Sequence, residues 1–392
     1  MDQKKRNTTI AVHGGTRKDD AFGAINEPIY MTSNYRIPTD CSPVDWSGIN
    51  SNIYQRNRNV NQMVLQDKLC ALIGAEDGAV FASGVAALAA VFTTFLNSGD
   101  HAIVSKVCYS ATNLLFRKYL PEKYGIEVTL LDTTDTEAVR AAVRPNTRLI
   151  HVETPGNPTT GISDLEAIAE IAHTAGALMS VDATFAGPIS IYPLRHGADL
   201  EIHSMTKYIN GHGDSLGGCV LGGRELINQI KELAMVNYGG ILSPFNAWLI
   251  ARGLVTAPLR MKQHSDTALA VSRWLEACPA VRFIWYPGLE SHPQHERAVR
   301  YMNGQYSGMI AFDIIGDEKA HQKFLDSLTL VTHAVSLGDV ESLIVYYDKT
   351  SDKLPHYPAI YREGFFRFSI GLEDADDVIA DLKQAMEKAD VL

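Results

Sequence analysis

The chain has 392 residues, of which 46% are hydrophobic and 20% charged, a composition that is ordinary for a soluble globular protein. Its formal net charge of −10 and its lack of Lys/Arg runs argue against a nucleic-acid-binding surface. No apolar stretch is long enough to span a membrane, and the N-terminal MDQKKRNTTI has no apolar core of a secretion signal. We therefore expect a globular protein with neither nucleic-acid nor membrane partners.

The cysteines and histidines form no recognisable metal or disulfide pattern. The five cysteines are odd in number and include no CxxC pair, which fits a reducing cytoplasm rather than a disulfide framework or a zinc site. The thirteen histidines include no HExxH motif. Structural roles are favoured for them, and no metal is expected.

Residues 1–60 are polar and weakly periodic, with Gly and Pro recurring along them, so they predict an arm rather than part of a core. The arm ends in the run Tyr54-Gln55-Arg56-Asn57-Arg58, which on its own reads as a solvated basic turn. The remaining length suggests two domains, and a change of pattern near Thr256 places their boundary. The expected division is an arm at 1–60, a large domain at 61–255 and a C-terminal domain at 256–392.

The large domain begins with apolar spacing that predicts a helix over 62–73, followed by a short strand over 79–82. Ser83 and Gly84 then lead into an alanine-rich helix that runs to about Phe95. A strand, a Ser-Gly turn and a helix together present backbone N–H groups and a helix N-terminus to an anion. The alternative is a serine that caps the helix and binds no ligand.

Strands and helices alternate from there to residue 204, which predicts a mainly parallel sheet with helices on both faces. Ligand sites in such sheets form at the carboxyl ends of the strands. No GxGxxG motif follows a strand, which argues against a dinucleotide site. Five polar or reactive residues end or follow predicted strands: Ser83, Tyr109, Asn157, Asp182 and Lys207.

The stretch 199–218, DLEIHSMTKYINGHGDSLGG, carries the strongest chemical signal. A short alternating strand leads into Ser204, Thr206 and Lys207, and four glycines follow. Two hydroxyl groups close to one amine can hold a phosphate beside that amine, which suits a Schiff base to pyridoxal phosphate (PLP). A surface lysine in a glycine-rich turn is the alternative.

Two further residues fit the same cofactor. Asp182 ends an apolar strand, and a buried acid is costly unless it is paired, so it either binds a pyridinium nitrogen or caps a helix. Tyr109 could stack on a ring or line the core.

The C-terminal part predicts an amphipathic helix over 259–276, strands over 281–286, 309–315, 328–335 and 365–370, and a closing helix over 374–389. Arg367 lies inside the apolar strand over 365–370. Its planar guanidinium fits either a structural glutamate or the carboxylate of a substrate.

Seven motifs in this order resemble the Cys/Met-metabolism family of PLP enzymes, over nearly the whole chain. They are Tyr54-Gln55-Arg56, Phe81-Ala82-Ser83-Gly84, Glu153-Thr154-Pro155-Gly156-Asn157-Pro158, Val181-Asp182-Ala183-Thr184, Ser204-Met205-Thr206-Lys207-Tyr208, Ser336-Leu337-Gly338 and Arg367-Phe368-Ser369-Ile370-Gly371-Leu372-Glu373. The resemblance implies an α/β protein with the aspartate-aminotransferase-like type I fold of PLP enzymes. That fold has a large domain with a mainly parallel seven-stranded sheet and a smaller α/β C-terminal domain.

The resemblance also implies a role for each matched residue. Lys207 would bind PLP covalently and carry protons, and Asp182 would pair with the pyridine nitrogen. Tyr109 would stack on the ring and donate a proton to the leaving group, and Asn157 would approach the 3-oxygen. Gly84, Ser204 and Thr206, with Ser83 nearby, would hold the phosphate, together with Tyr54 and Arg56 of a neighbouring subunit. Arg367 and Ser336, beside Tyr109, would bind the substrate. The shared site implies a dimer, and family members are commonly homotetramers.

The stretch Ala334–Asp339 resembles the methionine γ-lyase version of the family, but other positions depart from that pattern. Ala111 and the pair Val236-Asn237 replace residues typical of methionine γ-lyase, and the stretch 344–350 is also atypical. Tyr346, Tyr347 and Asp348 suggest a pocket for a polar or cationic side chain, such as that of canavanine. The alternative is that Asp348 is a solvated loop residue. The expected activity is γ-elimination from an L-amino acid with a heteroatom at Cγ. The alternatives are a cystathionine γ-lyase or γ-replacement, as in cystathionine γ-synthase or a sulfhydrylase.

Overall fold

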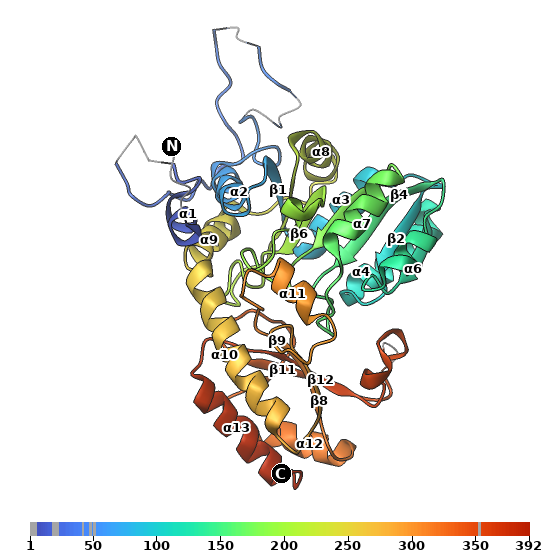
Figure 1. The fold of residues 1–392 in the computed structure, drawn as a ribbon. Helices are drawn as coiled ribbons and strands as arrows, with labels where there is room; N and C mark the ends of the chain where they lie inside the picture. The colour runs from blue at the N-terminus through green and yellow to red at the C-terminus, as the bar shows by residue number, and fades with distance from the viewer. Residues whose placement is uncertain (1–5, 18–22, 41–42, 47–48, 50–51, 352–353) are drawn as a thin grey trace.

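A computed structural model describes residues 6–17, 23–40, 43–46, 49, 52–351 and 354–392. Two β-sheets organise this part of the chain, a seven-stranded sheet in the upper body and a five-stranded sheet below it (Figure 1). A long helix, α10 (Ala257–Ala277), runs from one to the other. The boundary predicted near residue 256 falls at the start of this helix and stays a prediction.

The larger sheet has the strand order β1-β7-β6-β5-β4-β2-β3. Only β7 runs against its neighbours, since it pairs antiparallel with both β1 and β6 while β2 to β6 pair in parallel. The mainly parallel seven-stranded sheet is therefore confirmed. Its strands are β1 (Asp77–Phe81), β2 (His101–Ser105), β3 (Glu127–Leu131), β4 (Thr147–Glu153), β5 (Leu178–Asp182), β6 (Leu200–Ser204) and β7 (Gly218–Gly222).

Helices cover both faces of this sheet, as the alternating pattern predicts. One face packs on α3 (Gly84–Phe95), the turn around Phe116 and α8 (Arg224–Ile230). The other face packs on α1 (Asn7–His13), α2 (Val60–Ile73) and α9 (Pro244–Val255) at one end, and on α7 (Leu165–Thr174) at the other. Because both faces are covered, every strand except the edge strand β3 is buried at nearly every position.

The smaller sheet has the order β10-β11-β12-β9-β8, and it is antiparallel except where β10 pairs with β11. One face forms a core with α10, α12 (Glu318–Ser327) and α13 (Ala375–Lys388). The strands are β8 (Val281–Trp285), β9 (Met309–Ile314), β10 (Thr332–His333), β11 (Leu343–Tyr347) and β12 (Phe365–Ser369). α11 (His295–Tyr301) packs instead against the α7 side of the larger sheet.

Four elements differ from the sequence expectation. The strand expected over 328–335 shrinks to the two residues of β10, and β11 forms where no strand was expected. The helix that the alternating pattern places after β2 is three segments: α4 (Ser110–Leu114), the π-helix η1 (Leu115–Tyr119) and α5 (Leu120–Tyr124). β7 was missed because its sequence, GCVLG, is short and lies between glycines that read as turns.

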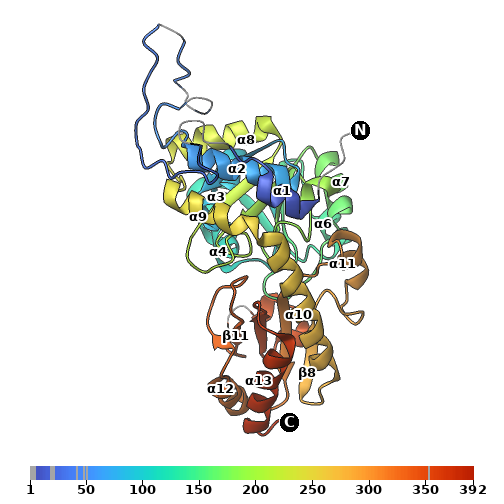
Figure 2. The same ribbon diagram turned by 90° about the vertical axis from the view of Figure 1, so that its left-hand side faces the viewer.

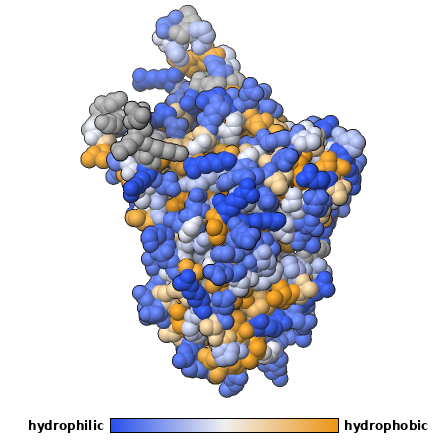
Figure 3. All heavy atoms as spheres, viewed as in Figure 1, coloured by the Kyte–Doolittle hydropathy of each residue, from blue (hydrophilic) through white to orange (hydrophobic). Residues whose placement is uncertain are grey.

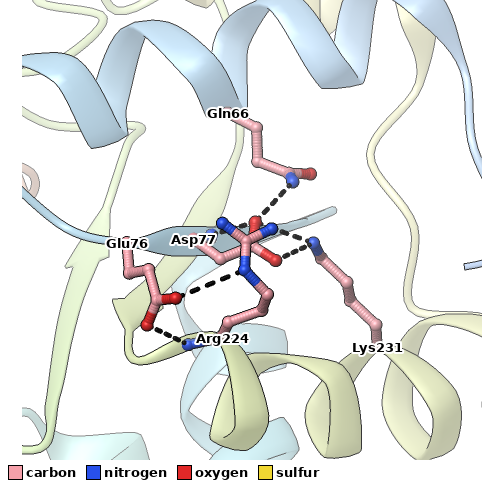
Figure 4. A network of polar contacts seen from close by, with 6 residues as sticks. Gln66, Glu76, Asp77, Arg224 and Lys231 are labelled. Carbon is pink, nitrogen blue, oxygen red and sulfur yellow. Dashed lines mark hydrogen bonds and ion pairs between the residues drawn. The ribbon is translucent and has the colours of Figure 1, made fainter. Parts of the chain in front are cut away.

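An ion pair anchors the edge of the larger sheet (Figure 4). Lys231, at the start of the π-helix η3 (Lys231–Asn237), donates to both carboxylate oxygens of Asp77 at 2.8 and 2.9 Å. Gln66 of α2 also donates to Oδ1 of Asp77 at 3.4 Å, and Arg224 of α8 pairs with Glu76 at 3.3 Å. These contacts fix β1, and β1 leads directly to Ser83.

α1 packs on the body, and the part of the arm that is described after it extends away from the body, as two views at right angles show (Figures 1 and 2). Its end is tied locally by a β-bridge between Asn34 and Tyr54. Hydrophilic side chains dominate the face of the molecule in Figure 3. Within the described ranges, no helix has the length and apolar character needed to cross a bilayer.

Candidate active site

The carboxyl ends of the parallel strands bring the predicted residues to one edge of the larger sheet. Ser204 ends β6, and Lys207 lies in the turn that follows. The Thr206 hydroxyl group accepts from the N–H of Gly217 at 3.1 Å and lies 3.3 Å from the Gly217 carbonyl oxygen. The glycine-rich loop is therefore fastened to the turn that carries Lys207.

The N-terminus of α3 meets the end of β6 at close range. A Cβ atom on Gly84 would lie 2.7 Å from Cβ of Ser204, so only glycine allows this approach. Oγ of Ser83 accepts from the N–H of Ala86 at 3.1 Å, so this serine caps the helix. The free N–H groups of the first turn, with the hydroxyl groups of Ser204 and Thr206 nearby, form a cradle suited to a phosphate.

Asp182 is buried at the end of β5, with 5% of its surface exposed. Oδ1 accepts from the Thr184 N–H at 3.0 Å and from the Thr184 hydroxyl group at 2.6 Å. The same hydroxyl oxygen accepts from the N–H of Ser204 at 2.8 Å, so Thr184 links Asp182 to β6. Burial raises the pKa of Asp182, while the two bonds from Thr184 lower it. A cation beside the carboxylate would favour its ionised form.

The amine of Lys207 faces the C-terminal part of the chain. Its Nζ donates to Oγ of Ser336 at 2.7 Å. Burial, and then the positive charge of Arg367, lower the pKa of Lys207 to about 8, while Asp339 acts in the opposite direction. A lysine with such a pKa is partly neutral near physiological pH, as a nucleophile and proton carrier must be.

Arg367 of β12 is buried and directed at the same space. Its guanidinium group donates to the Ser336 carbonyl oxygen at 2.9 Å and to Oδ1 of Asn157 at 3.4 Å. No acid pairs with it among the described ion pairs, and its Nε is buried without a partner. This argues against the structural-glutamate alternative and leaves donors for a carboxylate ligand.

Ser336 adopts a φ of +91°, in the region that favours glycine. A serine held there costs of order 1 kcal/mol or more, and such strain concentrates at functional sites. The residue presents its hydroxyl group to Lys207 and its carbonyl oxygen to Arg367.

Tyr109 and Asn157 are held by a residue to which the sequence motifs assigned no role. Oε2 of Glu153 accepts from the N–H of Tyr109 at 2.7 Å, and Oε1 accepts from the N–H of Asn157 at 3.0 Å. Glu153 ends the buried strand β4 as Asp182 ends β5, and that shared position could have identified it from sequence. Tyr109 is 44% exposed at the start of α4.

Tyr54 and Arg56 lie on the arm, not in the group around Lys207. The Arg56 guanidinium lies 5.4 Å from the centre of the Tyr54 ring, and Tyr54 is 43% exposed. Their role in a neighbouring subunit stays a prediction.

The hypothesis that Tyr346 helps to form a side-chain pocket is wrong. Val345 pairs with Arg367 in β11 and β12, so Tyr346 points to the opposite face of the sheet. There its ring stacks on His321 at 4.9 Å, within the core under α12. Tyr347 stacks on Phe365 on the same face as Arg367. The Asp348 carboxylate accepts from the hydroxyl group of Thr350 and from its N–H, the latter at 2.8 Å. These two hydrogen bonds lower the pKa of Asp348, as in an ordinary surface turn.

These residues fit PLP as a set. The cradle at Gly84 suits the phosphate of PLP, and the buried carboxylate of Asp182 suits its pyridine nitrogen. Lys207, with its lowered pKa, suits the aldehyde, and the exposed ring of Tyr109 suits the aromatic face. The fold and the site thus define a PLP-dependent enzyme of the type I class.

The comparisons with known proteins identify the family. The model of the Cys/Met metabolism PLP-dependent enzymes matches residues 8–387, and the chain belongs to that family. A canavanine γ-lyase of Rhizobium leguminosarum is 51% identical over 97% of this chain and 95% of its own length. A canavanine γ-lyase of Pseudomonas canavaninivorans is 47% identical over 97% and 96%. The crystal structure of metB from Corynebacterium glutamicum superposes with a TM-score of 0.90 at 36% identity, covering 98% of each chain.

The predicted family, the type I fold, the PLP cofactor and the class of carbon–heteroatom lyase are thereby confirmed.

Proposed function

We propose that this protein is a canavanine γ-lyase, which breaks the Cγ–O bond of canavanine and releases hydroxyguanidine. The observation that carries this proposal is the 51% and 47% identity to two canavanine γ-lyases, each over 97% of the chain. An L-methionine γ-lyase of Porphyromonas gingivalis and a cystathionine γ-lyase of Bacillus subtilis are each 39% identical over a similar span. The departures from the methionine γ-lyase pattern noted in the sequence agree with the higher identity to the canavanine γ-lyases.

Arg367 is the residue that we assign to the α-carboxylate of the substrate. Its guanidinium is buried, and its unpartnered Nε leaves a donor for a carboxylate oxygen. Ser336 holds the guanidinium through its carbonyl oxygen, which orients that donor. The amino acid would then lie with its Cα beside Lys207, because Ser336 contacts both side chains.

Lys207 is the proton carrier. When bound, PLP supplies a carbonyl group for the substrate amine and an electron sink for negative charge at Cα and Cβ. The pKa of about 8 leaves part of the Nζ amine neutral near physiological pH, so Nζ can take the Cα proton. We assign Asp182 to the pyridine nitrogen, which its carboxylate keeps protonated. We assign the phosphate to Gly84, Ser204 and Thr206, with Ser83 as the cap of α3.

Tyr109 is the residue that we assign as the proton donor to the leaving group. Its ring is 44% exposed at the start of α4, and Glu153 fixes its backbone. Asn157, fixed by the same carboxylate, is assigned to the 3-oxygen of PLP.

We further propose a homotetramer built from dimers, in which Tyr54 and Arg56 complete the phosphate site of the neighbouring subunit. The extended arm that carries both residues supports this assignment. The arm would comprise residues 1–60, the large domain 61–255 and the C-terminal domain 256–392. We place the protein in the cytoplasm, since the four cysteines in the described ranges form no disulfide.

The experiment that tests the proposal begins with the absorbance spectrum of the purified protein supplied with PLP. We expect a band near roughly 420 nm that is lost in Lys207→Ala. Canavanine, methionine, cystathionine and O-acetylhomoserine are then compared as substrates. Hydroxyguanidine, 2-oxobutanoate and homoserine are the products to measure.

We expect the highest kcat/KM with canavanine. A higher kcat/KM with methionine or cystathionine would contradict the substrate assignment but not the γ-lyase class. Formation of product only when a thiol is supplied would instead indicate γ-replacement, as in the O-succinylhomoserine sulfhydrylase of Pseudomonas aeruginosa, which is 38% identical.

A further inference from the structure

Glu153 is a buried acid of the site that contacts neither substrate nor cofactor in the scheme above. It is 4% exposed, and each of its two carboxylate oxygens accepts a backbone N–H. The two donors belong to Tyr109 and Asn157, which come from different segments of the chain. One side chain therefore joins the residue assigned to the cofactor ring with the residue assigned to its 3-oxygen.

The same carboxylate lies next to Asp182. Glu153 and Asp182 are register partners in the parallel strands β4 and β5, so their side chains point to the same face of the sheet. Burial raises the pKa of Glu153, and the negative charge of Asp182 raises it further, while the N–H groups of Tyr109 and Asn157 lower it. Tyr109, Asn157 and Asp182, which are the residues assigned to the pyridine ring, thus all lie next to Glu153.

A polar cavity of about 50 Å³ lies against Glu153 on the side of β2 and β3. It is lined by a chain of hydroxyl groups, in which Ser105 and Thr133 are 2.6 Å apart and Thr133 and Ser163 are 2.8 Å apart. Ser105 also accepts from the N–H of Glu153 at 3.3 Å. A cavity of this size and polarity can hold water, which would lower the cost of burying the acid.

Position 153 requires an acid because two N–H groups, those of Tyr109 and Asn157, donate to its side chain. A carboxylate accepts on both oxygens, whereas the amide of glutamine has one accepting oxygen and a nitrogen that only donates. A glutamine at this position would satisfy the N–H of Tyr109 or that of Asn157, and its own NH₂ group would oppose the other. A residue that served only to fill space would not require two acceptors.

We propose that Glu153 is a positioning residue that fixes Tyr109 and Asn157 relative to Asp182, so that the PLP ring is held in a single orientation. This inference rests on PLP as the cofactor and not on the identity of the substrate. It can therefore fail while the canavanine proposal stands, and the reverse is also true.

The test compares Glu153→Gln with the unchanged protein and with Ser163→Ala, which removes a polar group from the same cavity without contact to Tyr109 or Asn157. PLP is titrated into each apoprotein to measure its Kd, and the visible circular dichroism of the bound cofactor reports the orientation of its ring. Thermal unfolding of each apoprotein measures stability separately. None of these measurements uses a substrate.

For Glu153→Gln we expect the Kd for PLP to rise about tenfold, as the loss of one buried hydrogen bond predicts, and the visible circular dichroism to change. Ser163→Ala should leave both unchanged. A lower unfolding temperature for Glu153→Gln with an unchanged Kd and spectrum would overturn the proposal, because Glu153 would then serve stability alone.

A second comparison keeps the test informative if Glu153→Gln folds poorly. With Glu153→Asp the acid is kept but shortened, so that it reaches only one of the two N–H groups, and we expect an intermediate Kd and spectrum. If canavanine is turned over, kcat should fall more than KM rises in Glu153→Asp. The decrease in kcat caused by Glu153→Asp should also be smaller when Tyr109 is already replaced by Phe, since both substitutions then act through Tyr109. Fully additive losses and an unchanged Kd would contradict the proposal.

Discussion

Lys207 and Ser336 meet across the two sheets of the protein, with Nζ of the lysine donating to Oγ of the serine at 2.7 Å. Lys207 follows β6 of the seven-stranded sheet, and Ser336 lies between β10 and β11 of the five-stranded sheet. The serine reaches this position through a backbone φ of +91°. The amine that we assign as the proton carrier is thus held by a residue of the other sheet whose backbone has a positive φ.

The strain at Ser336 can be separated from its hydroxyl group by two substitutions. Ser336→Gly and Ser336→Ala both remove the partner of Lys207, so we expect kcat/KM to fall by a similar factor, about tenfold, in both. Glycine tolerates positive φ, so Ser336→Gly should be more stable than Ser336→Ala by roughly 1 kcal/mol. Denaturant unfolding and steady-state kinetics measure the two effects. Equal stability of the two variants would show that the backbone at this position is not strained in solution.

Thr184 should set the pH at which PLP is lost. Burial raises the pKa of Asp182, while the hydroxyl group and the N–H of Thr184 lower it. Thr184→Val removes the hydroxyl group, so the pKa of Asp182 should rise. Ionised Asp182 is the form that pairs with a protonated pyridine nitrogen. Cofactor affinity therefore falls as the pH falls through the pKa of Asp182, and in Thr184→Val this fall should begin at a higher pH.

The measurement is the Kd of the apoprotein for PLP across pH, with Thr184→Ser as the control that keeps the hydroxyl group. A pH profile of Thr184→Val that coincides with that of the unchanged protein would contradict the prediction.

Asp339 should raise the pKa of Lys207. Burial and Arg367 lower this pKa to about 8, and the negative charge of Asp339 opposes them. In Asp339→Asn the pKa of the lysine should fall further, so more of its amine is neutral at a given pH. The rate at which PLP attaches to the apoprotein rises as Lys207 loses its proton, and the midpoint of that rise should move to lower pH. A midpoint that moves to higher pH would be the wrong sign for this interaction.

The ion pair of Lys231 and Asp77 should stabilise the edge of the larger sheet (Figure 4). Both side chains are largely buried, so Lys231→Met leaves an unpaired buried carboxylate, and we expect it to cost about 2–3 kcal/mol of unfolding free energy. Arg224→Met, which breaks the exposed pair with Glu76, is the matched control and should cost much less unfolding free energy than Lys231→Met. Denaturant unfolding compares the two, and equal costs would count against the argument from burial.

Tyr346 and Asp348 should not affect substrate choice. Tyr346 points into the core under α12, and Asp348 belongs to a surface turn. Tyr346→Phe should cost about 1 kcal/mol of stability through its bond to His321, and Asp348→Asn should cost less. In both variants the ratio of kcat/KM for canavanine and methionine should remain unchanged. A shift of that ratio by tenfold or more in either variant would restore the pocket hypothesis.

The sequence alone predicted that the larger sheet is mainly parallel and which residues lie at its edge, although it did not reveal β7. Apolar strands alternate with helices, and that alternation allows few topologies other than a mainly parallel sheet with both faces covered. Ser83, Asn157, Asp182 and Lys207 follow or end strands of this sheet, and the carboxyl ends of parallel strands meet at one edge.

Only the tertiary structure shows which face of a strand each residue occupies and which distant residues are in contact. Whether Tyr346 or Tyr347 faces Arg367 depends on the register of β11 against β12, because a shift of one residue exchanges the two faces of a strand. The contact of Lys207 with Ser336 joins positions 129 residues apart in the chain.

The role of Glu153 depends on tertiary structure for the same reason. Its position at the end of a buried strand was visible in the sequence, but its partners were not. They are two backbone N–H groups and the adjacent Asp182, and only the folding of β4 beside β5 brings them together.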